Sequence, residues 1–143
     1  FDNSAEKLCR YLLDEKWFNP RTNSVSPQAF KPRPPRSEVD IHKTSIYRIN
    51  GLLENEIWEL GREFVSNLHP QHPPILARAE IQGKEILTVG LKILADGIPH
   101  PRHANIVGWP EEQESRQMKA VLLARKSSLK TLPNNLQPNF LKL

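Results

Sequence analysis

The segment from His69 to Pro110 constrains the fold of this chain most. Two apolar runs, Ile75–Ile81 and Glu85–Leu94, flank the pair Gln82-Gly83. Each run alternates so that one of its sides is apolar, which is typical of a half-buried strand, and glycine supplies the positive φ that tight turns need. The segment therefore predicts a β-hairpin. One-sided strands favour an antiparallel sheet covered by helices on one face, and Asn105-Ile106-Val107 is a candidate third strand.

The same segment carries a His-Pro-x-His tetrapeptide at each end. These are His69-Pro70-Gln71-His72 and His100-Pro101-Arg102-His103, and a hairpin would bring both to the same end. Four imidazoles match the number of ligands that zinc prefers, but zinc sites usually include cysteine or a carboxylate as well. No such residue stands at an indicative spacing. We therefore predict no metal and no cofactor, and keep His69, His72, His100 and His103 as the candidate ligands.

The second tetrapeptide also suggests acid–base chemistry. Imidazole exchanges its proton near neutral pH, as a general acid or base must. His100 or His103 could transfer the proton, and Arg102 between them could bind a phosphate. This pattern indicates a small metal-independent phosphodiester hydrolase of the ribonuclease type.

Local periodicity predicts further elements on both sides of this segment. Apolar residues recur at spacings of three and four in Leu52–Leu68, which predicts an amphipathic helix. Pro110–Lys126 has acidic residues in its first turn and basic residues in its last, as a helix dipole favours. Ser4–Glu15 shows the same helical spacing, with Cys9 on its apolar face. Val39–Ile49 alternates imperfectly and predicts a strand.

A chain of 143 residues is long enough for one domain with a substantial core. We expect an α+β fold, with a small antiparallel sheet packed by two or three amphipathic helices. The expected parts are an N-terminal helix over 1–18, a Pro-rich basic arm over 19–38, an α+β core over 39–126 and an extended tail over 127–143. Because the chain starts on phenylalanine, we expect it to be a fragment of a longer protein.

Basic residues suggest a binding surface. The run Lys31-Pro32-Arg33-Pro34-Pro35-Arg36 favours a stiff polyproline II segment that projects three cations. The net charge of +4 permits nucleic acid or an acidic protein as partner. The candidate binding residues are Lys31, Arg33, Arg36, Arg125, Lys126 and Lys130.

The rest of the composition narrows the class of protein. Cys9 is the one cysteine, so no disulfide can form within the chain, which fits a reducing compartment and a cytoplasmic location. No apolar run reaches the length of a membrane span. No Gly-rich phosphate loop, CxxC, HExxH or GxSxG motif is present. The leading hypothesis is a non-catalytic interaction domain that binds nucleic acid or a protein through its basic surface. The alternative is the hydrolase that uses His100 or His103.

Overall fold

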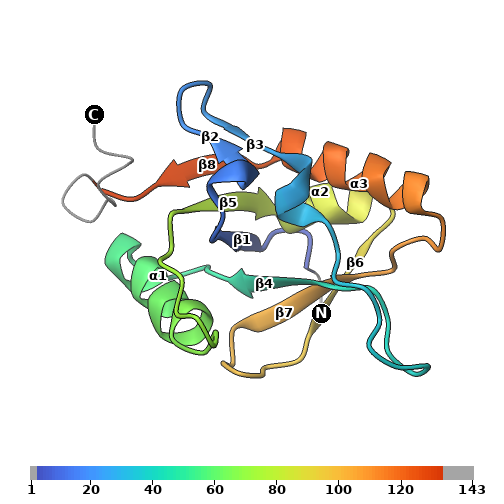
Figure 1. Cartoon of the computed structure of the whole chain (residues 1–143), viewed down its shortest axis with the longest axis horizontal. Coiled ribbons are helices and arrows are strands. Elements are labelled where there is room, and N and C mark those ends of the chain that lie inside the picture. The colour runs from blue at the N-terminus through green and yellow to red at the C-terminus, as the bar shows by residue number, and fades with distance from the viewer. Residues whose placement is uncertain (1–2, 134–143) are drawn as a thin grey trace.

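The computed structural model describes residues 3–133, and its central feature is a six-stranded sheet (Figure 1). The strand order is β6-β7-β4-β1-β5-β8, and every neighbouring pair is antiparallel. The strands are β1 (Lys7–Leu12), β4 (Thr44–Arg48), β5 (Ala77–Gln82), β6 (Lys92–Ala95), β7 (His103–Val107) and β8 (Ser128–Thr131). A separate hairpin pairs β2 (Phe18–Asn19) with β3 (Ser24–Val25). The fold is therefore α+β as predicted, but its sheet is larger than the small sheet expected.

Helices lie on both faces of this sheet. They are α1 (Glu54–Gly61, continued by π-helical turns over Arg62–Ser66), α2 (Gly83–Thr88) and α3 (Gln113–Lys126), with short 3-10 helices at Glu15–Trp17 and Pro27–Phe30. Figure 1 shows α2 and α3 on the side of the sheet opposite α1. Helix thus forms within both segments, Leu52–Leu68 and Pro110–Lys126, where it was predicted. Within residues 3–133, no helix is long and apolar enough to cross a membrane.

The N-terminal segment is a strand, which corrects the helix predicted over Ser4–Glu15. β1 lies inside the sheet between β4 and β5 and is covered on both faces. Leu8 and Leu12 pack in the core beneath α3, whereas Cys9 and Tyr11 pack in the core beneath α1. A strand buried on both faces has a nearly continuous apolar run. In a short segment such a run also satisfies the helical spacing, so the periodicity was ambiguous.

The predicted hairpin does not form. Ile75–Ile81 does contain most of β5, but the chain then enters α2 at Gly83 instead of turning back. The second run, Glu85–Leu94, is divided between α2 and β6, and β6 pairs with β7. Three strands separate β5 from β6 in the sheet. Asn105-Ile106-Val107 belongs to β7, so the third strand was predicted correctly.

The Pro-rich arm is largely integrated into the body. Residues 19–38 include β3 and a 3-10 helix whose Ala29 and Phe30 are fully buried. The following loop is anchored where Arg33 and Lys43 form an antiparallel bridge. The cationic run is therefore a fixed loop and not a free rod. The tail predicted over 127–143 forms β8 in its first part, and its residues 134–143 lie outside the described residues.

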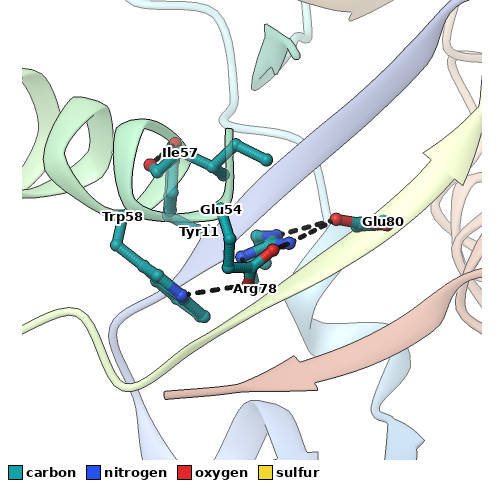
Figure 2. Close-up of polar contacts among 6 residues, drawn as sticks. All are labelled: Tyr11, Glu54, Ile57, Trp58, Arg78 and Glu80. Carbon is teal, nitrogen blue, oxygen red and sulfur yellow. Dashed lines mark hydrogen bonds and ion pairs between the residues drawn. The ribbon is translucent and has the colours of Figure 1, made fainter. Parts of the chain in front are cut away.

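An ion-pair cluster attaches α1 to the sheet (Figure 2). Arg78 on β5 donates to both carboxylate oxygens of Glu54 at 2.9 Å and to Glu80 at 2.6 and 2.9 Å. Its guanidinium lies 4.6 Å from the centre of the Trp58 ring, and the Trp58 indole donates to Glu54. The side chain of Arg78 is only 2% exposed. The positive charge of Arg78 is thus compensated by the carboxylates of Glu54 and Glu80, so we treat this cluster as structural.

Cys9 is fully buried in the core beneath α1, as its place on an apolar pattern suggested. Burial raises the pKa of its thiol to about 12. A thiol with so high a pKa carries almost no thiolate at neutral pH and is a poor nucleophile. Cys9 is therefore a packing residue.

Candidate functional site

A pocket of about 740 Å³ lies where β1 and β4 stop pairing. The backbones of these strands are paired at Leu8–Arg48 and Cys9–Tyr47. Beyond that point the side chain of Arg10 reaches across, donating to the backbone carbonyl of Ser45 at 3.0 Å and to that of Ala29 at 2.8 Å. The region where β1 and β4 are no longer paired thus forms one wall of the pocket.

Three polar side chains in the pocket wall form a hydrogen-bonded relay. The Ser45 hydroxyl oxygen lies 2.6 Å from Nε2 of His103, and Nδ1 of His103 lies 2.6 Å from Oδ1 of Asp96. Asn105 donates from its amide to the other carboxylate oxygen of Asp96 at 3.0 Å. All four residues line the pocket. The arrangement has the order and the distances of a serine–histidine–aspartate triad.

Sheet pairing holds the members of this relay together. Ser45 on β4 stands directly opposite Asn105 on β7, and Tyr47 stands opposite His103. The Tyr47 ring and the His103 imidazole pack edge to face with centres 5.1 Å apart. Asp96 follows β6, the strand beyond β7. Two paired strands, β4 and β7, and the residue that directly follows β6 therefore hold the relay.

The protonation of Asp96 decides which way the relay is oriented. Burial acts to raise the pKa of its carboxyl, but hydrogen bonds from His103, from the backbone of Ile98 and from Asn105 outweigh it, so the pKa is lowered. At neutral pH the carboxylate can only accept. Nδ1 of His103 must then donate to Asp96, and in the neutral imidazole Nε2 accepts the proton of the Ser45 hydroxyl.

Cationic side chains line the same pocket as the relay. Lys31, Arg33, Arg36 and Lys43 line the pocket together with Arg10, whereas Asp96 is the one carboxylate that residues 3–133 place in the pocket wall. Arg33 and Lys43 form ion pairs with Asp40, which lies beside the pocket. Hydrogen bonds from Arg33 and from the backbone of Arg36 hold the pKa of the Asp40 carboxyl well below its usual range. In the part of the chain that is described, the side chains of Lys31 and Arg36 form no ion pair.

Arg10 differs from the exposed cations Lys31 and Arg36 of this pocket because it is half-buried. Its guanidinium is held by two backbone carbonyls and lies 5.3 Å from the centre of the Trp17 ring, which also lines the pocket. Burial lowers the pKa of Arg10 to about 10, so it remains charged at neutral pH. Within residues 3–133 it has no carboxylate partner. The pocket therefore has a positive potential that an anion would compensate.

The structure separates the residues predicted for acid–base chemistry. His103 is buried in the relay, but His100 packs its ring on Phe64 with centres 4.6 Å apart. Arg102 donates to the backbone carbonyls of Arg48 and Asn50. His100 and Arg102 line a different, smaller pocket beside α1. Of the predicted trio, only His103 faces the basic pocket.

The four histidines are likewise not gathered at one point. His69 lines the basic pocket with His103, whereas His100 faces α1 and His72 is exposed. Among residues 3–133, no group of three or more histidine, cysteine, aspartate or glutamate side chains is placed to hold a metal ion.

The six predicted binding cations fall into two groups. Lys31, Arg33 and Arg36 line the basic pocket. Lys126 and Lys130 line a groove at the β8 edge, on the far side of β1 from β4, and Arg125 precedes Lys126 at the end of α3. The six predicted cations therefore do not all line one pocket.

Two residues of the relay were missed in the sequence. Ser45 falls at the break in the alternation of Val39–Ile49, and Asp96-Gly97 reads as a strand end. Ser45 and His103 are 58 residues apart, and no short motif links residues at such a distance. The one local signal of the relay was Ser45, a polar residue inside the imperfectly alternating segment Val39–Ile49.

No protein-family model, curated protein or solved structure was found to match this chain.

Proposed function

We propose that this protein binds single-stranded nucleic acid through the basic pocket. The observation that carries the proposal is that five cationic side chains and Trp17 line the same pocket. Phosphate groups are drawn to clustered lysine and arginine, and bases stack on aromatic rings. A protein that binds single strands combines these two features in one groove.

The charge inside the pocket supports an anionic ligand. Arg10 is charged and desolvated without a carboxylate partner in the described residues, and Lys31 and Arg36 are exposed at the pocket. A phosphate bound there would compensate charge that the protein leaves unmatched. The pocket volume of about 740 Å³ lies within the range of about 300–1,000 Å³ that is common for ligand pockets. A pocket of this size suits part of a flexible single strand better than a duplex.

Binding of a fluorescent single-stranded 12-mer, measured by anisotropy at several salt concentrations, tests this proposal. For single strands the logarithm of affinity falls with the logarithm of salt by about 0.7 for each phosphate contact. We expect the double variant Lys31→Ala/Arg36→Ala to bind at least about tenfold more weakly and, if each cation contacts one phosphate, to have a slope smaller by about 1.4.

The matched control is Arg125→Ala/Lys126→Ala, which removes the same charge from the end of α3. We expect it to stay within about twofold of the unmodified protein. Equal weakening by both variants would show that only net charge matters and would overturn the assignment to the pocket. Binding of poly-glutamate as strong as that of the oligonucleotide would instead favour an acidic protein as the partner.

A further inference from the structure

We propose that Ser45, His103 and Asp96 form a nucleophilic triad that cleaves a phosphodiester bound in the basic pocket. The inference rests on the proposed function for its substrate class, but the relay itself stands on its own geometry. Ser45 is the nucleophile, His103 is the general base and acid, and Asp96 is a positioning residue. This keeps the phosphodiester chemistry expected for His103 and replaces His100 and Arg102 with Ser45 and Asp96.

The relay has the connections that activation of a serine requires. Both of its hydrogen bonds are 2.6 Å long, and Asn105 fixes the second oxygen of Asp96. With its Nδ1–H donated to Asp96, His103 presents Nε2 as the acceptor for the Ser45 proton. A nucleophile, a base within hydrogen-bond reach and a third group that orients the base together define an activated hydroxyl.

The relay also faces the basic pocket, where a substrate would bind. The His103 side chain is 9% exposed, whereas Asp96 keeps 37% of its side chain exposed and Ser45 is half-buried in the pocket wall. The base is thus shielded from water while the nucleophile faces the pocket.

Cations beside the nucleophile match the charge that phosphoryl transfer develops. Lys43 precedes Ser45 by two residues in extended backbone, so both lie on the same side of the strand. Arg33 and Arg36 line the same pocket. Charge on the non-bridging oxygens increases as the fifth bond to phosphorus forms, and fixed cations stabilise that state. This favours a phosphodiester over a neutral acyl ester as the substrate.

The reaction can be written with every proton placed. The Ser45 oxygen attacks phosphorus while its proton moves to Nε2 of His103. The bond from phosphorus to the leaving oxygen breaks, and that oxygen takes the proton from Nε2. Water then attacks the phosphoryl-serine and gives a proton to Nε2. The bond from phosphorus to the Ser45 oxygen breaks, and Ser45 regains its proton from His103, which leaves a phosphomonoester and an alcohol.

Hydrolysis of bis(4-nitrophenyl) phosphate, followed by release of nitrophenolate, tests the triad in the full chain. We expect Ser45→Ala and His103→Asn each to lower kcat at least about 100-fold. Asp96→Asn should lower kcat and leave KM nearly unchanged, because Asp96 acts through its hydrogen bond to His103. Ser128→Ala, which changes an exposed serine on β8, is the matched control and should keep full activity.

Covalent capture tests the nucleophile without relying on any variant of the base. An alkyl fluorophosphonate should add one phosphonyl group to the unmodified protein and to Ser128→Ala, and peptide mapping should place it on Ser45. Failure to modify Ser45 in the folded protein, or retention of activity by a folded Ser45→Ala variant, would overturn the proposal. So would hydrolysis of 4-nitrophenyl acetate with no cleavage of the phosphodiester.

The two proposals fail separately. If the oligonucleotide binds but bis(4-nitrophenyl) phosphate is not cleaved, the triad is refuted and the binding function stands. If the phosphodiester is cleaved through Ser45 but the oligonucleotide does not bind, the binding function is refuted and the triad stands.

Discussion

Two arginines on neighbouring strands show how the surroundings of one residue type decide its role. Arg78 is matched by Glu54 and Glu80 and stacked on Trp58, so its charge is used within the fold (Figure 2). Arg10 is held by carbonyl groups and has no carboxylate partner among the described residues. The first arrangement stabilises the structure, and the second leaves a positive charge at the pocket.

We predict that Arg78→Ala strongly destabilises the protein. Removing one partner of a buried ion pair leaves the others uncompensated and typically costs about 3–5 kcal/mol. The buried acceptor here is Glu80, whose side chain is 12% exposed. The measurement is the free energy of unfolding in urea, with the midpoint followed by circular dichroism.

Arg62→Ala is the control for this change. Arg62 pairs with Glu59 on the surface of the same helical segment, where both side chains are about half exposed. Exposed pairs contribute about 0–1 kcal/mol, so this variant should unfold near the urea concentration of the unmodified protein. If both variants lose the same stability, the Arg78 cluster does not hold α1 to the sheet as described.

At the scale of the elements, the position of α1 depends on a close approach to β1. Gly61 at the end of α1 faces the Tyr11 ring, and a Cβ at Gly61 would lie 2.5 Å from a ring carbon. The Tyr11 hydroxyl donates to the backbone carbonyl of Ile57. Both contacts fix the distance between helix and sheet, so the small size of residue 61 is a packing requirement.

We predict that Gly61→Ala destabilises the protein, although alanine favours helix. In an exposed helix this change would add about 1 kcal/mol of stability. Here the added methyl group must displace a buried ring, and overpacking of this kind typically costs about 1–3 kcal/mol. Thermal and urea unfolding report the sign, and Glu59→Ala on the exposed side of α1 is the control. A stabilised Gly61→Ala variant would contradict the packing of α1 on Tyr11.

At the scale of the whole molecule, β1 joins two parts of the sheet. It pairs with β4 on one side and with β5 on the other, and its two faces contribute to both cores. Without β1, the strands β6, β7 and β4 lose all backbone pairing with β5 and β8. The pocket would also lose Arg10.

We therefore predict that a chain beginning at Leu13 does not fold cooperatively. It should show no urea transition, and a synthetic peptide with the sequence of residues 1–12 should restore one, together with oligonucleotide binding. The control peptide carries Leu8→Asp and Leu12→Asp, which place two charges in the core beneath α3 and should restore neither. A cooperative transition in the shortened chain alone would show that β1 is not the central strand.

Local patterns sufficed for several parts of this protein. The periodicity of Leu52–Leu68 and the charged ends of Pro110–Lys126 predicted where helix forms, and alternation predicted β5 and the strand that contains β4. The buried place of Cys9 and the α+β class followed from the same signals. Each of these depends on which side of one short segment is apolar, and that is recorded in neighbouring residues.

Tertiary structure alone decided the rest. β1 resembled a helix because burial on both faces hides the period of two, and β6 left its expected partner because the energy of sheet pairing depends on strands far apart in sequence. Ser45 lies on β4, His103 lies on β7 and Asp96 directly follows β6, and the pairing of these strands brings Ser45 and Asp96 each within 2.6 Å of His103. Their chemistry therefore follows from distances across the sheet, which no spacing along the chain encodes.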